Sequence, residues 1–436
     1  MRKNIILLSV LFCLTDYSCF SQKITVERNK PELVAEFQQL GFGMFIHWSL
    51  DVQLGAIISH NVAVGSRDYQ DIYFNDLQKT FNPKKFDPED IAILAKLAGM
   101  KYMVFTAKHH NGFCMWDTKT GDFKITNTPY GKDILRELIE AFRAYDIKVG
   151  LYFSPDDYYL SYKQGLPPSR NTPATECPNN AQIWNQNKAQ LKELLTDYGK
   201  IDFLFLDEKT DWVNPLVANY CWDIAPDLVI TRGGMATPEQ HLPDKPIPGS
   251  WEACFTIGDH WQYVPDDNWK NATTLIDMLI ETRAKGGNLL LNIGPDSYGE
   301  IPPEQVARLR EIALWNMANH ESIYNIKPFE VISQDKIWFT QSLDEKAIYA
   351  FLPGDDWKWM ERKNFLIPSF ASTDSTKISV LGQNDIVMEY DIDVSPKTYF
   401  SSNELGMLVS VIKGQRLNKT WDNRVVIKME NVVYRN

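Results

Sequence analysis

Two carboxylate residues stand where apolar segments end, and their surroundings suit acid–base chemistry. Asp207 follows the apolar run at 203–206, and Glu252 lies between a tryptophan and an apolar Ala-Cys pair. Apolar surroundings raise the pKa of a carboxyl group. A carboxylate nucleophile paired with a partly desolvated carboxylic acid is the usual equipment for cleaving a glycosidic bond. The sequence therefore predicts Asp207 as a nucleophile and Glu252 as an acid/base.

The stretch AKHHNGFCMWD at 107–117 places two histidines side by side. Neighbouring side chains on a β-strand point to opposite faces, so His109 and His110 share one pocket only if the strand ends there. The Asn-Gly turn signal that follows supplies such an ending. Together with His47, these rings could donate and accept hydrogen bonds and so hold sugar hydroxyls.

The elements that must position these residues alternate between strand and helix patterns from about residue 30 to 330. Several strand candidates are continuously apolar, which is typical of parallel strands buried on both faces. The pattern predicts an α/β fold, a (β/α)₈-like (TIM-type) barrel, whose active site lies at the carboxyl ends of the strands. An open doubly wound sheet is the alternative, but no GxGxxG follows an early strand. The candidate strands are 42–48, 101–109, 148–154, 201–207, 227–232 and 288–294.

The two ends of the chain differ from this central part. Residues 1–22 have a basic start and an apolar stretch too short to span a bilayer, which predicts a cleaved signal peptide. Export would leave the protein in a periplasm or outside the cell, and no later segment is a transmembrane candidate. After the catalytic domain, expected at 23–330, short alternating runs broken by turn residues predict an antiparallel β-sandwich at 331–436.

The composition restricts the partners. With 45 basic and 56 acidic residues, the net charge of −11 argues against a nucleic-acid partner. The 13 tryptophans and 19 tyrosines suit stacking on sugars or bases, and equally an aromatic core. The four cysteines after the leader have no CxxC spacing, so the sequence predicts buried free thiols. One disulfide among them is an alternative.

Six segments together resemble the motif series of the α-L-fucosidases of glycoside hydrolase family 29. They occur in the family's order, and the C-terminal part resembles the family's β-sandwich. The resemblance implies an exo-acting retaining enzyme that releases terminal α-L-fucose from a carbohydrate by double displacement, without a metal or an organic cofactor. The segments are GFGMFIHWSL, KYMVFTAKHHNGFCMWDTKT, VGLYFSP, LLTDYGKIDFLFLDE, GSWEACFTIGDHWQY and GGNLLLNIGPDSYGEIPPEQ.

The resemblance also implies residue roles. Asp207 matches the nucleophile, and Glu252 matches the acid/base of the subgroup with the closest WE-type motif. Trp48, which follows the first strand, is expected to supply an apolar wall of the sugar pocket. The residues expected to bind the sugar are His47, Trp48, Asp68, Tyr69, His109, His110, Tyr152, Arg232 and Trp261.

The departures from the family pattern bear on which sugar is bound. Asp207-Glu208 stands where the family usually reads Asp-Gly, and Asp68-Tyr69 stands for the usual Glu-Trp pair. Asn111 and Asp156 also replace a common Asp and an aromatic residue. Because the first two changes fall at the expected pocket, an α-L-galactosidase, including one for substituted L-galactose, is an alternative. A catalytically silent sugar-binding homologue is another.

A metal-dependent hydrolase is the alternative from a different class. The three expected pocket histidines and Asp207 converge at one barrel mouth, and His and Asp are zinc ligands. The adjacent His-His pair lacks the spacing of familiar metal-binding strands and helices, such as HExxH. The sequence therefore predicts no metal.

Overall fold

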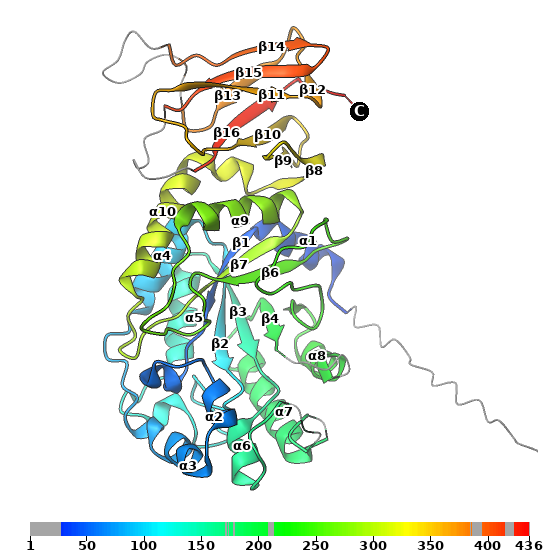
Figure 1. Ribbon diagram of the computed structural model, residues 1–436. Helices are drawn as coiled ribbons and strands as arrows, with labels where there is room; N and C mark the ends of the chain where they lie inside the picture. Colours follow the sequence, from blue (N-terminus) through cyan, green and yellow to red (C-terminus); the bar gives the residue numbers. More distant parts are fainter. Residues whose placement is uncertain are drawn as a thin grey trace, which may run out of the picture.

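The computed structural model describes residues 28–170, 172, 174–177, 179–207, 213–383, 385, 395–414 and 423–435. The expected signal peptide at 1–22 and Glu208 lie outside the described residues. Figure 1 shows a barrel-like body built from the N-terminal part and, stacked against one end of it, a layer of antiparallel C-terminal strands. Within the described ranges, every helix is too short or too polar to cross a membrane.

The body is built around a curled parallel sheet in the order β5-β4-β3-β2-β1-β7-β6. Four of its five inner strands are buried along their whole length, which accounts for their largely apolar sequences. The strands are β1 (Phe42–Ile46), β2 (Tyr102–Lys108), β3 (Lys148–Phe153), β4 (Phe203–Leu206), β5 (Val229–Ile230), β6 (Glu252–Thr256) and β7 (Asn288–Ile293). This sheet confirms the predicted (β/α)₈-like class, with seven strands in the described part of the chain.

Helices follow most strands and cover the sheet. The start and end of α4 illustrate how the sequence sets them: the Asp87 side chain accepts the backbone N–H groups of Glu89 and Asp90, and Gly99 ends the helix at φ 89°. The α-helices are α1 (Pro31–Leu40), α2 (His60–Val64), α3 (Arg67–Asn75), α4 (Pro88–Ala98), α5 (Ile134–Ala144), α6 (Tyr158–Lys163), α7 (Ala181–Thr196), α8 (Val213–Ile224), α9 (Ala272–Ala284) and α10 (Pro303–Asn319). Short 3₁₀ turns lie at η1 (Leu50–Leu54), η2 (Leu77–Lys79), η3 (Ile125–Asn127) and η4 (His320–Ser322).

The connection between β5 and β6 is irregular. After a turn at Gly233-Gly234, residues 235–240 run parallel to β6 and pair with it mainly through backbone groups, and the Gln240 side chain adds a hydrogen bond to Thr256. The N–H of Cys254 donates to the carbonyl of Pro238 at 3.0 Å, and the N–H of Gln240 donates to the carbonyl of Cys254 at 3.0 Å. This 235–240 segment therefore extends the sheet beside β6 and carries its side chains to the same end as the other strand termini.

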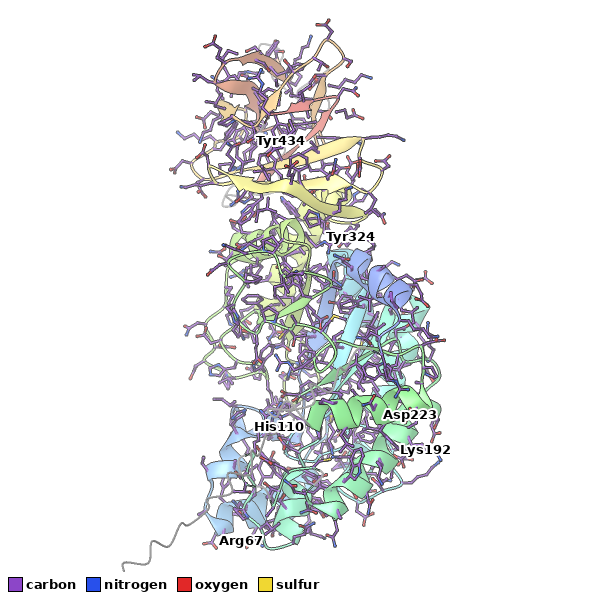
Figure 2. All side chains as sticks on the ribbon, turned by 90° about the vertical axis from the view of Figure 1, so that its right-hand side faces the viewer. Arg67, His110, Lys192, Asp223, Tyr324 and Tyr434 are labelled. Atoms are coloured by element: carbon purple, nitrogen blue, oxygen red, sulfur yellow. The ribbon has the colours of Figure 1, made fainter. Side chains whose placement is uncertain are left out.

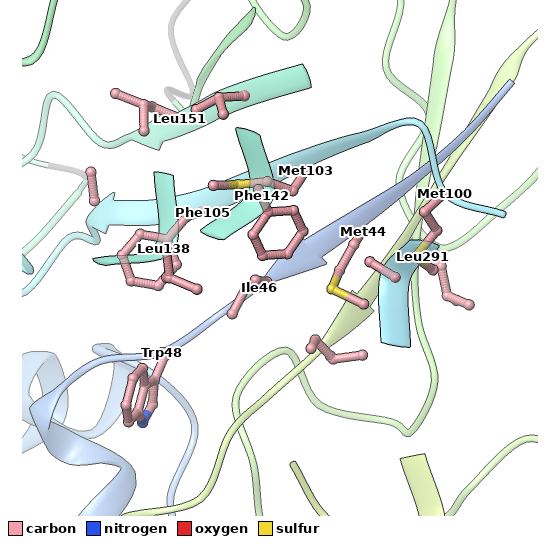
Figure 3. Packing of buried hydrophobic residues seen from close by; sticks show 14 of the residues in the cluster. Met44, Ile46, Trp48, Met100, Met103, Phe105, Leu138, Phe142, Leu151 and Leu291 are labelled. Atoms are coloured by element: carbon pink, nitrogen blue, oxygen red, sulfur yellow. The ribbon is translucent and has the colours of Figure 1, made fainter. Parts of the chain in front are cut away.

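A large apolar core fills the space between the sheet and its helices. Figure 3 shows Met44 and Ile46 of β1, Phe105 of β2, and Leu138 and Phe142 of α5 packed together. All of these side chains are buried. Such packing fixes the strand ends rigidly, which the site above them requires.

The C-terminal strands form antiparallel sheets around a separate apolar core. The five-stranded sheet has the order β13-β16-β10-β9-β8 and the three-stranded sheet the order β11-β15-β14. The first strand of this C-terminal part, β8, begins slightly before the predicted domain boundary at 331. The strands are β8 (Ile326–Gln334), β9 (Ile337–Ser342), β10 (Ala347–Leu352), β11 (Arg362–Ile367), β12 (Phe370–Ala371), β13 (Lys377–Val380), β14 (Tyr399–Asn403), β15 (Gly406–Ile412), β16 (Val425–Glu430) and β17 (Val433–Tyr434).

Polar contacts fasten this layer to the helices at the base of the barrel. The Arg424 guanidinium pairs with Asp277 of α9 at 2.7 Å, and the Trp315 indole N–H of α10 donates to the Arg424 carbonyl at 3.0 Å. The five-stranded sheet thus packs on α9 and α10, at the end of the barrel away from the carboxyl ends of the strands (Figure 1).

Candidate active site

A pocket of about 460 Å³ opens at the carboxyl ends of the barrel strands. In Figure 2, His110 of this pocket lies far from the C-terminal sheets, which carry Tyr434. The pocket is lined by Phe45, His47, Ile57, Ile58, His60, His109, His110, Tyr152, Arg170, Phe205, Asp207, Arg232, Glu239, Cys254, Asp259, His260 and Trp261. Of the residues predicted from the sequence, seven are in this set: His47, His109, His110, Tyr152, Asp207, Arg232 and Trp261.

Asp207, directly after β4, is held by four donors. The Tyr152 hydroxyl donates to Oδ2 at 2.6 Å, and His110 Nε2 lies 3.2 Å from the same oxygen. The guanidinium groups of Arg232 and Arg170 lie 3.3 and 3.5 Å from Oδ1. The carboxylate is therefore fixed in orientation, although 15% of its side chain stays exposed to the pocket.

The electrostatic setting keeps Asp207 ionised. Burial opposes the charged form, but the hydrogen bond and charge of His110 and the charges of Arg170 and Arg232 outweigh it and hold the pKa of Asp207 well below its usual range. A carboxylate that stays charged at neutral pH and faces a pocket is suited to act as a nucleophile.

His110 supplies one of these positive charges. Its Nδ1 lies 2.5 Å from the Ser154 hydroxyl and 3.3 Å from Asp156 Oδ2. Burial works against protonation, yet the hydrogen bonds to Asp156 and Asp207 raise the pKa of His110 above its usual value. The two neighbouring carboxylates therefore favour the protonated form of His110.

The other two histidines predicted to bind the sugar, His47 and His109, are neutral. Burial lowers the pKa of His47 to about 3 and that of His109 well below its usual value. His47 Nδ1 lies 2.6 Å from Asn292 Oδ1, and the amide nitrogen of Asn292 donates to the Trp261 carbonyl. Because an amide oxygen only accepts, His47 carries its proton on Nδ1 and presents Nε2 as an acceptor.

The end of β2 brings both adjacent histidines to one side. The pairing register shifts just before Lys108, and the chain then turns through Gly112 at φ 84°. A Cβ atom at Gly112 would lie 2.4 Å from Asp157 Oδ1, so the turn requires glycine. The rings of His109 and His110 lie with their centroids 4.2 Å apart, and both line the pocket, as predicted.

Glu252, the predicted acid/base, does not line the pocket. It is fully buried on β6, where the Tyr102 hydroxyl donates to its Oε2 at 2.6 Å. Burial raises its pKa to about 7, as its sequence surroundings indicated. Since residues i and i+2 share one face of a strand, Cys254 reaches the pocket while Glu252 lies one layer deeper in the barrel. This position contradicts direct proton transfer to a bound substrate.

Glu239 is the second carboxylate that lines the pocket. Its Oε2 accepts a hydrogen bond from Arg232 Nη2 at 2.7 Å, and Nη1 of the same guanidinium contacts Asp207 at 3.3 Å. Its side chain is 41% exposed. One arginine thus links the two carboxylates. Glu239 was missed because the 235–240 segment has no strand or helix pattern, and its nearness to Arg232 was the one available signal.

Three predicted sugar ligands lie elsewhere. Trp48 is fully buried against the rings of Phe81 and Phe86, and its indole N–H donates to the Asp296 carbonyl. Since neighbouring residues face opposite ways, His47 enters the pocket while Trp48 enters the core. Trp48 therefore packs in the scaffold.

Asp68 and Tyr69 belong to α3 and are also outside the pocket. Asp68 is exposed, and the Tyr69 ring packs partly against the core, with its hydroxyl accepting from Asn61. The preceding loop supplies Ile57 and Ile58 to the pocket, and the start of α2 supplies His60. Neither residue of the Asp68-Tyr69 pair therefore lies at the pocket position that the alignment with the family's Glu-Trp pair predicts.

Further pocket residues were not predicted. Arg170 comes from the loop before α7, and its Nε pairs with Asp156 at 2.9 Å as its Nη2 approaches Asp207. Asp259 and His260 lie at the rim beside Trp261, where His260 Nδ1 contacts Asp267. These residues lie on irregular chain, so periodicity gave no signal for them.

The cluster also bears on metal binding. Ligand atoms of His109, His110 and Asp207 lie within 4.8 Å of one another, close enough to hold one ion. However, the guanidinium groups of Arg170 and Arg232 and the His110 ring, whose pKa is raised, already surround this carboxylate. Their positive charges would repel a cation. The arrangement fits a charged nucleophile better than a metal centre.

A parallel barrel with a charged carboxylate, a second carboxylate and neutral hydrogen-bonding rings in one pocket has the groups that a glycoside hydrolase requires. The family model described as alpha-L-fucosidase matches residues 16–321. The chain belongs to the α-L-fucosidase family.

Individual relatives agree. The tissue alpha-L-fucosidase of Homo sapiens is 29% identical over 400 residues, which cover 83% of this chain and 84% of the relative. The alpha-L-fucosidase of Dictyostelium discoideum is 30% identical over 313 residues, 65% of this chain and 66% of the relative. Among solved structures, alpha-L-fucosidase isoenzyme 1 from Paenibacillus thiaminolyticus superposes with a TM-score of 0.74 at 28% identity, covering 93% of this chain and 99% of that one.

Proposed function

We propose that this protein releases terminal α-L-fucose by a two-step displacement in which Asp207 is the nucleophile and Glu239 the acid/base. The observation that carries the proposal is the Arg232 guanidinium, which contacts both carboxylates at the pocket. Family membership supports the fucoside as substrate.

In the first step, Asp207 attacks the anomeric carbon, and the bond to the leaving oxygen breaks. Glu239 gives its proton to that oxygen, so the leaving group departs as a neutral alcohol. In the second step, the Glu239 carboxylate takes a proton from water, which attacks the same carbon and releases Asp207. Two displacements at one carbon give net retention of configuration.

The exposure of the two carboxylates supports this division of roles. Asp207 is held by charged and hydrogen-bonding neighbours and needs no proton during the cycle. Glu239 is the more exposed, so a leaving group and water can both reach it. Glu252, buried beneath the pocket, has no such access.

The apolar part of the lining supports L-fucose over L-galactose. Phe45, Ile57, Ile58 and Phe205 offer apolar surface, and L-fucose carries a methyl group where L-galactose carries a hydroxymethyl group. A hydroxyl placed against apolar surface without a partner is unfavourable. A comparison of kcat/KM for the aryl α-L-fucoside and the aryl α-L-galactoside tests this preference, and a higher value for the galactoside would contradict it.

The mechanism is tested with 2-deoxy-2-fluoro-L-fucosyl fluoride. Fluorine at C2 slows both steps, while fluoride is a good leaving group, so the fucosyl-enzyme accumulates. We expect mass spectrometry to find one added sugar on the peptide that contains Asp207, and proton NMR of an aryl fucoside digest to show α-L-fucose as the first product. Labelling of another carboxylate, or β-L-fucose as the first product, would contradict the proposal.

The azide ion separates the two carboxylates. In a Glu239→Ala variant, azide attacks the fucosyl-enzyme and gives α-L-fucosyl azide. In an Asp207→Ala variant, azide replaces the nucleophile and gives β-L-fucosyl azide after a single displacement. If Glu252→Ala instead of Glu239→Ala yields the α-azide, the acid/base assignment to Glu239 is wrong.

We also propose that the chain is exported. The basic and apolar pattern of residues 1–22 supports a cleaved leader. N-terminal sequencing of the mature protein recovered from a secreting host tests it. A mature chain that begins near residue 23 is the expected result, and an intact Met1 in the exported fraction would contradict cleavage.

A further inference from the structure

Ser59 lies behind the pocket and contacts one of its histidines. It precedes α2 and is 1% exposed. Its Oγ lies 2.7 Å from His109 Nδ1 and accepts the backbone N–H of Asn111 at 3.0 Å. The serine hydroxyl therefore joins the loop before α2 to the turn that ends β2.

The direction of the Ser59–His109 hydrogen bond follows from these contacts. The Asn111 N–H already occupies a lone pair of the hydroxyl oxygen. Of the two groups that contact Ser59 Oγ within the described residues, only His109 Nδ1 can accept the hydroxyl hydrogen. Because His109 is neutral, an accepting Nδ1 places the ring proton on Nε2.

The backbone of Ser59 is held in a conformation that serine rarely adopts. Its φ of 60° and ψ of −16° fall in the left-handed region. Asp51 accepts the Ser59 N–H at 2.7 Å and the Tyr73 hydroxyl at 2.9 Å, and Tyr73 in turn accepts from Asn111. This ring of buried polar groups fixes the strained serine. Such strain gathers at functional sites when the surroundings enforce it.

The imidazole of His47, next to His109 in the pocket, has the opposite tautomer. His47 donates from Nδ1 to Asn292, which leaves Nε2 as an acceptor. The two rings lie 5.9 Å apart in the same pocket. They thus offer one acceptor and one donor to adjacent sugar hydroxyls.

We propose that Ser59 is a positioning residue that fixes the Nε2–H tautomer of His109, so that His109 donates to a sugar hydroxyl while His47 accepts from one. This inference rests on the proposed function, because the hydroxyls belong to the bound fucose. The pair would distinguish sugars by the direction of their hydroxyl hydrogen bonds as well as by hydroxyl position.

The informative variant is Ser59→Gly. Glycine removes the hydroxyl but adopts φ 60° without strain. We expect kcat/KM on an aryl α-L-fucoside to fall by about tenfold to a hundredfold, because a misaligned pocket group costs on this order. Glycine relieves the backbone strain but leaves the buried Asn111 N–H without this acceptor, so the midpoint of thermal unfolding should change little. A residue with a purely structural role would lower activity and thermal stability together.

The matched control is Ser322→Ala, since Ser322 is equally buried and donates to the Asn319 carbonyl far from the pocket. We expect this control to keep the kcat/KM of the unchanged protein. Unchanged kcat/KM in Ser59→Gly, or a lower midpoint that accounts for the lost activity, would overturn the inference.

A second measurement does not depend on activity. In protein labelled with ¹⁵N-histidine, the His109 ring signals, assigned by their loss in His109→Gln, should report a proton on Nε2. In Ser59→Gly they should move toward a mixture of tautomers. A proton on Nδ1 in the unchanged protein would overturn the inference. If the tautomer is as expected but no fucoside is cleaved, the proposed function fails and the Ser59 contact does not.

Discussion

The two walls of the pocket are built in different ways. The wall with Asp207, His110 and Tyr152 stands on buried strands, and side chains hold one another there at 2.6 to 3.2 Å. The wall with Glu239 stands on the 235–240 segment, which pairs with β6 mainly through its backbone. The side chain of Glu239 is 41% exposed, against 15% for Asp207. In the proposed mechanism, the group that must keep its charge is thus held rigidly, and the group that exchanges protons stays accessible.

The largest effect is expected on the rigidly held wall. Asp207→Ala removes the attacking group, and we expect kcat on an aryl α-L-fucoside to fall by roughly 10⁴-fold or more. Steady-state kinetics and circular dichroism together check this result. Activity within tenfold of the unchanged protein would refute the idea that this wall carries the nucleophile.

The accessible wall gives a smaller effect that depends on the leaving group. Glu239→Gln should lower kcat/KM about 10²- to 10⁴-fold for an unactivated oligosaccharide, which needs a proton donor. For a dinitrophenyl fucoside, whose leaving group needs no proton, the loss should be much smaller. Glu252→Gln is the matched control, because it changes a carboxyl of the same type outside the pocket. If Glu252→Gln shows the leaving-group dependence and Glu239→Gln does not, their roles are reversed.

The buried Glu252 should reveal itself in stability. Its pKa rises from 4.5 to about 7 in the folded protein, so between these values the unfolded chain ionises while the folded chain stays protonated. The folded state therefore loses stability as pH rises through this window. Relative to Glu252→Gln, the unchanged protein should lose roughly 3 kcal/mol of unfolding free energy. Urea unfolding at pH 4.5 and 8 measures the difference, and a constant gap would contradict it.

The cations beside the nucleophile should set the acidic limb of the pH profile. Arg170→Gln removes one guanidinium near Asp207, so the pKa of Asp207 rises toward its ordinary value. The fall of kcat/KM with decreasing pH should then begin about one pH unit higher. A profile from pH 3 to 8 checks this. A shift toward lower pH would show that Arg170 does not stabilise the charged carboxylate.

The smallest effect is expected outside both walls. Asp68→Ala and Tyr69→Phe should leave KM for the fucoside unchanged, since neither side chain lines the pocket. Ile57→Asn, in the neighbouring loop, is the positive comparison and should raise KM by placing an amide in the apolar lining. A larger KM change for Asp68→Ala than for Ile57→Asn would restore the original alignment.

The sequence was informative where burial imposes a pattern. The strand ends at His47, His110 and Asp207 were predictable because apolar runs precede them and parallel strands finish at one edge. The same logic identified the barrel class and its strands. Alternation along a strand also explains one error, because Trp48 follows His47 and so points to the opposite side.

Most of the remaining differences between prediction and structure fall on segments that have no strand or helix periodicity. Nothing in the 235–240 segment indicates that its backbone pairs with β6, so Glu239 was invisible to pattern reasoning. Glu252 was attractive because its apolar neighbours raise its pKa, but a raised pKa does not show whether a group can reach the substrate. Arg170 likewise arrives from a loop whose path is set by tertiary contacts.

The backbone pairing of the 235–240 segment has a consequence for the evolution of the site. Backbone hydrogen bonds do not depend on which side chain a residue carries, apart from proline. Substitutions in this segment can therefore exchange or relocate the proposed proton donor without disturbing the buried strands that hold the proposed nucleophile. New leaving-group preferences can arise on one wall while the attack on the anomeric carbon is inherited unchanged from the other.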